Sequence, residues 1–295
     1  MRNYLTKFFE EFDYPAESRP FMLSAYDSIM AKDTAASAFN EMLASYDASY
    51  DIDYGAAIER MKTVSAEAGI HEYTGALLLF LCFSKRLEKY YEEAGLDRSI
   101  FVTSMYDLKY KIIECILVRG VWGSYVPSWF AGFFYLNRFG FCRLQFEIIK
   151  FNDEYEKDGI KLTPDSKVIN VHIPRTGTRL DEESRKRSYA MAAEFYKDRL
   201  GNEPIVFVCN SWLLFPRHYE MLKPTANLYA FMEDYDVFRS GFYDNYDQIW
   251  RLFDTVYNED HSKLPQDTSL RREYVKLFDA GEKTGWGRGV YVYKG

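Results

Sequence analysis

A strand, a short loop and a helix follow one another in residues 167–200, and this unit constrains the fold more than any other segment. Residues 167–173 form an apolar run that predicts a buried strand. A loop follows at 174–180. The residues in 181–200 then predict an amphipathic helix with acids in its first turn. In this order, the unpaired backbone N–H groups at the start of the helix point toward the loop.

The residues of this loop suit an anion. Gly177 allows the backbone to approach a ligand closely, and Arg175 and Arg179 add positive charge. Phosphate or pyrophosphate is the common ligand at a helix N-terminus of this kind. An ordinary connection between a strand and a capped helix is the alternative. The loop has one glycine and neither a Walker lysine nor a complete G-x-G-x-x-G motif.

The overall charge argues against nucleic acid or an anionic membrane as a partner. The 295 residues carry a formal net charge of −7, and no basic run is interleaved with aromatic residues. A chain of this length suits two domains, or one domain with a substantial extension. Aromatic residues reach 18%, so some could line a cleft for an apolar or planar ligand. The alternative is that they pack helical layers against a sheet.

The four cysteines predict neither disulfides nor a metal site. Each stands alone in apolar surroundings without a C-x-x-C pair, which indicates reduced thiols in a cytoplasmic protein. The N-terminal residues include acids where a signal peptide needs an apolar run. The longest apolar stretch, Gly75 to Phe83, is far shorter than the roughly 20 residues that cross a bilayer. We therefore expect neither secretion nor membrane insertion.

The first part of the chain predicts a helical domain over residues 1–122. Apolar residues recur there at helical spacing, as in Leu108, Ile112 and Ile116. We expect four or five helices, each bounded by Asp, Gly or Pro. Their expected ranges are 19–31, 34–45, 54–68, 70–93 and 97–118.

The pattern changes to strands after Gly120, which predicts a second domain over residues 123–295. Strands at 129–136 and 141–151 flank a short turn and predict an antiparallel hairpin. In the second of these strands polar residues alternate with apolar ones, so one face of the strand is polar. Further strands are expected at 167–173, 204–209, 227–235, 248–257 and 290–293, and helices at 181–200, 210–222 and 268–280.

Together these elements predict an α+β fold, in which a helical domain precedes a mixed sheet flanked by helices. Strand-helix-strand units within one sheet tend to be parallel, so strands 167–173 and 204–209 should lie side by side. A ligand slot commonly forms where two such strands splay at their C-terminal ends. The residues expected at these ends are His172, Arg175, Cys209, Asn210 and Ser211.

Several local strings of the second half carry a family resemblance. They are Arg143-Leu-Gln-Phe-Glu147, Val171-His-Ile-Pro174 followed by Thr176-Gly177, Asn210-Ser-Trp-Leu-Leu214 and Leu264-Pro-Gln-Asp-Thr-Ser-Leu-Arg271. With the order of elements, they resemble the GNAT superfamily of acyl-CoA-dependent N-acyltransferases. More closely, the chain is similar to bacterial proteins that join a helical N-terminal domain to a GNAT-like C-terminal domain.

The resemblance implies a cosubstrate and residues that bind it. In the superfamily, the strand before the central loop lines acyl-CoA, and amides of the loop and of the next helix hold its pyrophosphate. The amine enters from the other side of a splayed strand pair. By resemblance, acetyl-CoA or another acyl-CoA is the cosubstrate, and no metal takes part. The residues that take the cofactor-binding role are Ile173, Arg175, Thr176, Gly177 and Thr178.

The chain departs from the family pattern at two places. Its loop is one glycine short of the usual R/Q-x-x-G-x-G/A sequence, and three acids follow at 181–183. Asn210 stands where related sequences often carry His before Ser-Trp. If that histidine served as a base, this chain lacks it.

Transfer of an acyl group from a thioester to an amine needs a base, a donor to the carbonyl oxygen and a proton source for the thiolate. Glu147 and His172 are the candidate bases. The alternatives are a salt bridge between Glu147 and Arg143, and a core His172 bonded to backbone. Tyr219 and Ser211 are the candidate proton donors by resemblance, with packing as the alternative for Tyr219.

The first functional hypothesis is an N-acyltransferase that passes an acetyl or longer acyl group to a small-molecule or peptide amine by direct attack in a ternary complex. The alternative is a non-catalytic ligand-binding or regulatory protein that kept the GNAT-like fold; the unusual loop and Asn210 favour it. A hydrolase has little support, because the four histidines show no paired metal spacing and no G-x-S-x-G occurs. A homodimer is an open expectation.

Overall fold

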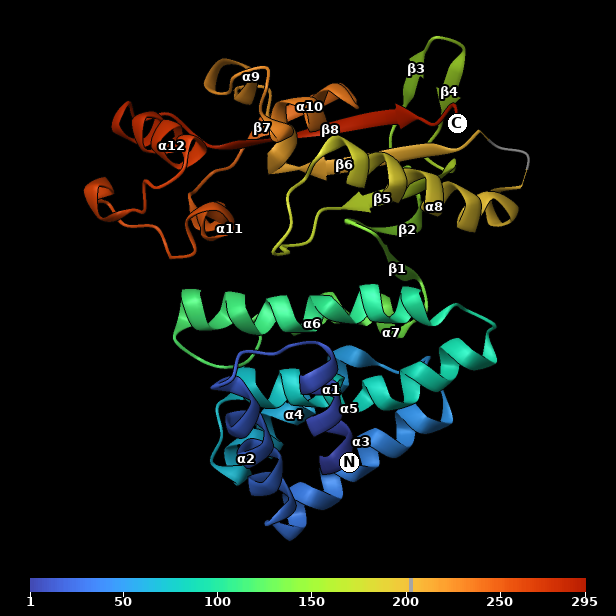
Figure 1. Ribbon diagram of the computed structural model, residues 1–295, viewed down its shortest axis with the longest axis vertical. Coiled ribbons are helices and arrows are strands. Elements are labelled where there is room, and N and C mark those ends of the chain that lie inside the picture. The colour runs from blue at the N-terminus through green and yellow to red at the C-terminus, as the bar shows by residue number, and fades with distance from the viewer. Residues whose placement is uncertain (202–203) are drawn as a thin grey trace. The chain divides into compact units, whose positions relative to one another are not determined.

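The computed structural model describes residues 1–201 and 204–295 (Figure 1). The chain forms two compact units, Met1–Phe139 and Gly140–Gly295. The domain boundary expected between residues 122 and 123 stays a prediction, because it concerns which part of the chain folds independently.

Helices make up the N-terminal unit, as the apolar periodicity predicts. All five expected helices are present, with ends that differ by a few residues, and α1 is an additional one. The helices are α1 (Arg2–Glu11), α2 (Ser18–Met30), α3 (Asp33–Ala48), α4 (Tyr54–Ala68), α5 (Glu72–Glu93) and α6 (Arg98–Arg119), followed by the short turns η1 (Pro127–Phe130) and α7 (Ala131–Phe134).

Helix α5 lies at the centre of this helical core. Every residue in 74–84 is buried, as expected for a helix that is packed on all sides and not along one stripe. Aromatic rings pack around it: the centroids of Tyr46 and Phe83 lie 4.5 Å apart, and those of Phe80 and Phe134 lie 5.0 Å apart. Packing in this core therefore accounts for part of the high aromatic content.

The strand expected at 129–136 is wrong, because this segment is helical. Phe130, Phe133 and Phe134 are buried at the i, i+3 and i+4 spacing of one helix face. A short apolar run fits a buried strand and a buried helix equally well, so periodicity alone did not separate them. The first strand of the sheet lies at Arg138–Phe141 instead.

Within the described residues, the C-terminal unit is built on a six-stranded sheet with the order β1-β2-β5-β6-β8-β7. The central strands β5 and β6 are parallel, and the pairs β2/β5, β6/β8 and β7/β8 are antiparallel. A helical unit followed along the chain by this mixed sheet confirms the predicted α+β fold. The strands are β1 (Arg138–Phe141), β2 (Leu144–Lys150), β5 (Lys167–His172), β6 (Val206–Ser211), β7 (Asp236–Phe242) and β8 (Gly285–Val292).

Each face of this sheet has its own cover. Helix α8 (Glu182–Leu200) packs on one face, where the rings of Tyr189 and Phe207 lie 5.1 Å apart and Tyr196 Oη donates to the Phe146 carbonyl at 2.8 Å. The hairpin of β3 (Tyr155–Lys157) and β4 (Ile160–Leu162) contributes to the apolar cluster on the other face. The buried members of that cluster are Phe151, Leu162, Val168, Val206, Val208 and Val290.

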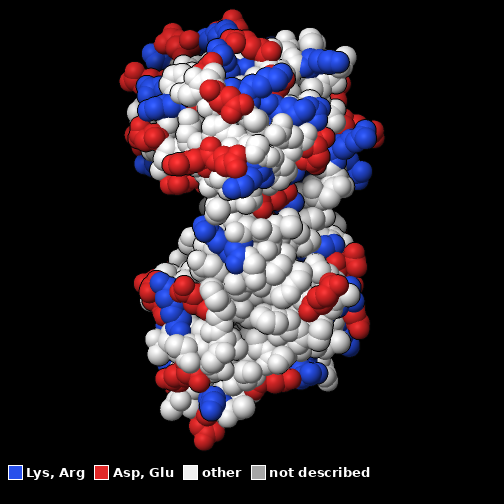
Figure 2. Space-filling view, turned by 90° about the vertical axis from the view of Figure 1, so that its left-hand side faces the viewer, with Lys and Arg blue, Asp and Glu red and all other residues white. Residues whose placement is uncertain are grey.

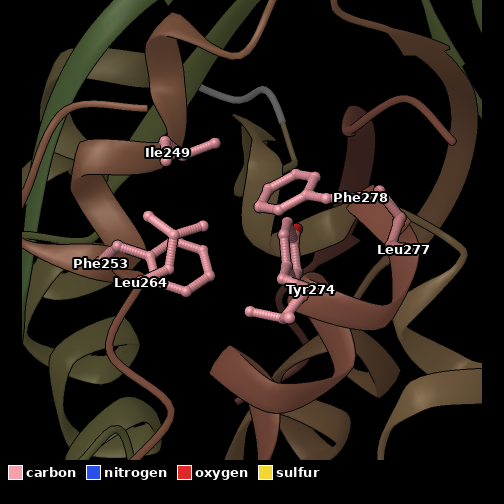
Figure 3. Packing of buried hydrophobic residues seen from close by; sticks show 7 residues of the cluster. Ile249, Phe253, Leu264, Tyr274, Leu277 and Phe278 are labelled. Carbon is pink, nitrogen blue, oxygen red and sulfur yellow. The ribbon is translucent and has the colours of Figure 1, made fainter. Parts of the chain in front are cut away.

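The long connection between β7 and β8 has a small core of its own (Figure 3). Ile249, Phe253 and Leu264 face Tyr274 and Phe278 of α12 there. The short elements around this core and before it are η2 (Trp212–Leu214), α9 (His218–Met221), α10 (Asn227–Glu233), η3 (Asp247–Ile249), α11 (Trp250–Phe253), η4 (His261–Lys263) and α12 (Ser269–Asp279).

The strands expected at 227–235 and 248–257 are wrong. Helix α10 occupies the first range, and η3 with α11 occupies much of the second. Ile249 and Phe253 are buried at i, i+4 spacing, as one side of a helix requires. The expected helix at 268–280 is confirmed as α12.

Candidate functional site

The two central strands part at their C-terminal ends. Their parallel pairing covers Ile169 with Phe207 and Asn170 with Val208. Beyond this point β5 stays paired with β2 up to His172, and β6 stays paired with β8 up to Ser211. The sheet therefore opens between β5 and β6 toward the loop, as the predicted ligand slot requires.

A carboxylate and an imidazole meet beside this gap. Glu147 of β2 and His172 of β5 are joined by an Oε1 to Nε2 contact of 2.6 Å. The side-chain amide of Asn170 lies 3.1 Å from the same ring nitrogen and donates to Glu147 Oε1 at 3.4 Å. The Glu147 side chain is 11% exposed and that of His172 is 19% exposed, so the pair is largely withdrawn from water.

Strand register explains why these three side chains meet. Glu147 lies opposite Asn170, and residues that face each other across an antiparallel pair project to the same side of the sheet. His172 is two residues beyond Asn170 and projects to that side too. Phe146 points to the opposite side, toward α8. The polar strip thus lies on the face that α8 does not cover.

Asn210 lies on the same side of the sheet, across the gap from His172. Each is two residues beyond the last parallel row, Asn170 with Val208, so the period of two places both on one face. Asn210 is exposed, and within the described ranges its side chain has no hydrogen-bond partner. The gap is therefore flanked by an imidazole on one strand and a carboxamide on the other.

Ser211 and Tyr219 do not contact the Glu147 and His172 pair within the described residues. Ser211 caps η2, where its Oγ accepts the Leu213 N–H at 3.2 Å. Tyr219 packs its ring against Tyr229 of α10, with centroids 5.0 Å apart. Burial and the nearby Glu233 raise the pKa of Tyr219 to about 12, which makes this phenol a weaker acid than an ordinary tyrosine.

The loop after β5 contains the residues expected to bind the cofactor. Ile173 follows the last residue of β5, and Gly177 and Thr178 are exposed. Thr176 Oγ1 lies 2.9 Å from Thr178 Oγ1 and accepts the Thr178 N–H at 3.3 Å, which gives the loop a compact turn.

Two buried arginines hold the two ends of this loop. Arg143 donates from Nη1 to the Pro174 carbonyl at 2.9 Å. Arg185, whose side chain is 1% exposed, donates from Nη1 to the Leu180 carbonyl at 3.2 Å and pairs at 2.7 Å with Asp234, the residue that follows α10. The loop is thus positioned at its start by the residue that precedes β2 and at its end by α8.

The start of α8 is already capped by an acid. Asp181 Oδ1 accepts the Ser184 N–H at 2.8 Å, and this bond lowers the pKa of the Asp181 carboxyl. Glu182 and Glu183 follow in the first turn. These acids suit the helix dipole, but they repel an anion placed on the helix axis. The amides of the loop are therefore better placed than those of α8 to bind a phosphate.

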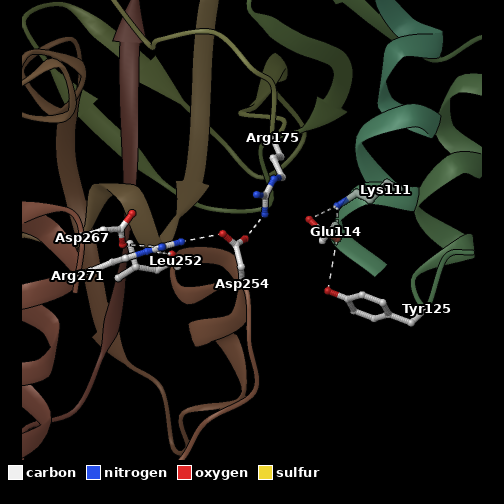
Figure 4. Close-up of polar contacts among 8 residues, drawn as sticks. All are labelled: Lys111, Glu114, Tyr125, Arg175, Leu252, Asp254, Asp267 and Arg271. Atoms are coloured by element: carbon white, nitrogen blue, oxygen red, sulfur yellow. Dashed lines mark hydrogen bonds and ion pairs between the residues drawn. The ribbon is translucent and has the colours of Figure 1, made fainter. Parts of the chain in front are cut away.

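Arg175 of the loop is engaged by a carboxylate. Its Nη1 pairs with Asp254, which also pairs with Arg271 Nη2 of α12 at 2.7 Å (Figure 4). Asp254 follows α11 and has a left-handed backbone, with φ 58° and ψ 22°. Sequence reasoning missed Asp254 and Arg271 as neighbours of the loop, since no local pattern connects segments so distant in the chain.

Two other reactive groups near β6 are buried and inert. Burial raises the pKa of the Cys209 thiol well above its ordinary value, so the thiol is not primed as a nucleophile. His218 is fully buried, and its Nε2 lies 2.7 Å from Tyr274 Oη while Nδ1 lies 3.3 Å from the Leu213 carbonyl. Burial lowers the pKa of His218 to about 4, so this ring is neutral at physiological pH.

The described part of the chain contains no group of three or more His, Cys, Asp or Glu residues that could hold a metal ion. Among its helices, none has the length and apolar character needed to cross a membrane. On the face of the C-terminal unit drawn in Figure 2, basic and acidic side chains are interspersed. This face therefore lacks the single-sign basic field that phosphate-rich polymers require.

The fold and the gap in the sheet are those of a GNAT-like protein, and the family comparison agrees. The model of the N-acyltransferase N-terminal domain matches residues 3–136, and the model of the GNAT-like C-terminal domain matches residues 136–291. The chain therefore belongs to the family with a GNAT-like C-terminal domain, preceded here by an N-acyltransferase N-terminal domain. No curated protein matches the chain.

Several solved structures share the fold. An acyltransferase in complex with decanoyl-CoA has a TM-score of 0.75 and 17% sequence identity, and the match covers 98% of this chain and 87% of that one. An acyltransferase mutant in complex with octanoyl-CoA has a TM-score of 0.78 at 17% identity with the same coverage. An acyltransferase in complex with decanoyl-CoA and teicoplanin has a TM-score of 0.73, again at 17% identity and the same coverage.

Proposed function

We propose that this protein is an acyl-CoA-dependent N-acyltransferase that passes the acyl group directly to an amine in a ternary complex. The observation that carries the proposal is the gap between β5 and β6, with the Glu147 and His172 pair at its edge. Membership in the GNAT-like family supports the acyl-CoA cosubstrate, as do the fold neighbours solved with decanoyl-CoA and octanoyl-CoA.

The acyl-CoA lies between the parted strands in this proposal. Beyond Asn170 and Val208 the facing edges of β5 and β6 no longer pair with each other, and backbone polar groups at such an edge need a partner. An extended amide-containing chain, such as the pantetheine arm, supplies it. The pyrophosphate then reaches the loop, where Ile173, Arg175, Thr176, Gly177 and Thr178 bind it.

The Glu147 and His172 pair acts as the base. The imidazole of His172 takes a proton from the ammonium of the acceptor, and Glu147 orients the ring and stabilises the imidazolium that forms. The neutral amine attacks the thioester carbonyl carbon, and the bond from this carbon to sulfur breaks. The nitrogen then loses its second proton, which restores the group that protonates the departing thiolate. A buried carboxylate beside the ring favours this proton transfer, because the charges of the pair cancel.

The CoA thiolate takes a proton as it leaves, and Ser211 and Tyr219 are the proposed donors. Ser211 is the last residue of β6, at the gap. Its Oγ accepts the Leu213 N–H, which leaves the Ser211 hydroxyl hydrogen able to donate. Tyr219 is the tyrosine donor that the resemblance to GNAT enzymes implies. Its pKa of about 12 exceeds that of a thiol, so the phenol is a weaker acid than the thiol that forms. The Ser211 hydroxyl is also a weak acid, so its position at the end of β6, and not its acidity, favours Ser211 over Tyr219, whose ring packs against Tyr229.

The acceptor is proposed to be a small-molecule or peptide amine. One fold neighbour was solved with decanoyl-CoA and teicoplanin, and another with CoA and 10C-teicoplanin. An acetyl group and a longer acyl chain are both open for this protein. Three further properties also stay predictions: a homodimer, a cytoplasmic location and a bacterial source. Native mass spectrometry tests the homodimer, and the same measurement detects any bound CoA.

A non-catalytic ligand-binding or regulatory protein is the second candidate. Three observations favour it: the acids at 181–183, the pairing of Arg175 with Asp254, and Asn210 beside the gap. This candidate predicts acyl-CoA binding without turnover, and ligand affinity that is intact in a His172→Ala variant.

Release of free CoA from acyl-CoA over a broad panel of amines separates the two candidates. The enzyme proposal predicts amine-dependent CoA release with acetyl-CoA, octanoyl-CoA or decanoyl-CoA. If one of these ligands binds but none of the amines accelerates CoA release, the non-catalytic candidate replaces it.

A further inference from the structure

Two arginines from distant segments meet at one carboxylate in the C-terminal unit (Figure 4). Asp254 receives Arg175 of the loop on Oδ1 and Arg271 of α12 on Oδ2. Each carboxylate oxygen therefore has its own guanidinium. The side chains of Arg175, Asp254 and Arg271 are 33%, 23% and 15% exposed, so an incoming ligand can reach this cluster.

The two arginines differ in how firmly they are held. Arg271 donates from Nε to the Leu252 carbonyl at 2.8 Å and from Nη1 to Asp267 at 2.8 Å, besides its bond to Asp254. Arg175 has Asp254 as its polar partner in the described part of the chain. Arg271 is thus a fixed anchor, and Arg175 is the member that can change partner.

Asp254 has a backbone conformation that is unfavourable for most residues. Its φ of 58° lies in the left-handed region, which carries a cost for an L-residue, although aspartate tolerates it better than most. The two ion pairs offset this cost. Arginine binds carboxylate and phosphate through the same N–H donors, so the Asp254 carboxylate lies where a phosphate group would bind.

We propose that Arg175 and Arg271 form one phosphate site for acyl-CoA, and that the Asp254 carboxylate occupies this site until the ligand displaces it. The inference rests on the proposed acyl-CoA function. Asp254 competes with the ligand phosphate for Arg175, so it lowers the affinity and favours release of CoA after transfer. Displacement of Asp254 also couples ligand binding to the segment that follows α11.

Titration calorimetry of the intact chain with CoA tests this competition. The Asp254→Asn variant keeps the side-chain shape and tolerates the left-handed backbone but removes the charge, so we expect its Kd for CoA to fall about tenfold. Arg175→Ala should raise Kd about tenfold and abolish the gain in the double variant. The control Asp165→Asn, which removes an exposed ion pair with Lys150, should change Kd less than about twofold.

Dephospho-CoA and inorganic pyrophosphate show which phosphate group of CoA binds the two arginines. They also separate a failure of this inference from a failure of the proposed function. If the Asp254→Asn gain vanishes with dephospho-CoA, the site takes the 3′-phosphate, and if it persists, the site takes the pyrophosphate. If neither wild type nor variant binds CoA, the proposed function fails. The affinity of both proteins for inorganic pyrophosphate then tests whether Arg175 and Arg271 form an anion site. Tighter pyrophosphate binding by Asp254→Asn supports the inference. Unchanged or weaker binding of both CoA and pyrophosphate by this variant overturns it.

Discussion

At the scale of single residues, the chemistry depends on the contact between Glu147 and His172. Alternation of polar and apolar residues in the strand expected at 141–151 found Glu147, and the expected C-terminal end of the strand at 167–173 found His172. Asn170 lies two residues before His172 on the same face of the strand and contacts both side chains. The period of two along a strand could therefore have identified Asn170 as well. The partner of Arg175 was not, since a packed loop and not a local pattern brings Asp254 to it.

Replacing either member of the pair should remove turnover and leave binding intact. We expect Glu147→Gln and His172→Asn each to lower kcat about 10²-fold to 10⁴-fold, which is the usual contribution of a positioned base. The Kd for acyl-CoA should change little in calorimetry, because neither side chain belongs to the proposed phosphate loop. Equal losses of kcat and of acyl-CoA affinity would instead assign the pair a role in folding or binding.

A buried histidine outside the gap predicts how stability depends on pH. The folded-state pKa of His218, about 4, lies below the unfolded value near 6.5, so the unfolded state binds more protons as the pH falls. Stability from this group is complete above pH 6.5 and is lost between pH 6.5 and pH 4. We expect a loss of about 2 kcal/mol at pH 5 relative to pH 8.

Urea unfolding of wild type and His218→Gln at pH 8 and pH 5 measures this contribution. The variant carries no titrating group at this position, so the difference between its two free energies of unfolding should be smaller than that of wild type by about 2 kcal/mol. An equal pH dependence in both proteins would show that the ring does not titrate in this range.

At the scale of elements, long periodic segments were predictable and short apolar ones were not. The five expected helices of the N-terminal unit and α8 and α12 are present, because a 3.6-residue period persists over many turns. The ranges 129–136, 227–235 and 248–257 are each too short for the period to separate a strand from a helix. Their packing partners, such as α12 against Phe253, decide the outcome.

Close approach of β8 to η2 explains a pattern of glycines that periodicity does not. A Cβ atom on Gly287 would lie 2.0 Å from the Leu214 carbonyl oxygen, and one on Gly289 would lie 2.7 Å from Tyr235. Gly285 meets Phe215 in the same way. These alternate positions let the strand pack directly against Leu214 and Phe215, which follow β6, and against Tyr235, which precedes β7.

Gly287→Ala should therefore destabilise the protein by about 3 kcal/mol, near the upper end of the usual cost of overpacking, because the neighbour is backbone. Ser240→Ala is the matched control. Ser240 is exposed on β7 and lies opposite Gly287 in the register, so its replacement should cost less than about 0.5 kcal/mol. Chemical denaturation measures both variants. A Gly287→Ala variant as stable as the control would refute the close packing.

At the scale of the whole molecule, the two-part α+β organisation was predictable and the source of the aromatic excess was not. Composition left open whether the rings line a cleft or pack the interior. The N-terminal core and the small core between β7 and β8 bury many of them. The central parallel pair was also predictable, because one crossover helix joins two buried strands.

In the proposed function, acyl-CoA binds the C-terminal unit at the gap between β5 and β6 and at the loop that follows β5. Titration calorimetry of the intact chain with acetyl-CoA, octanoyl-CoA and decanoyl-CoA tests it most directly. We expect saturable binding of at least one of these ligands, and we expect Gly177→Val, which obstructs the loop backbone, to weaken this binding about tenfold. Absence of binding by all three ligands, or identical affinity in the Gly177→Val variant, would contradict it.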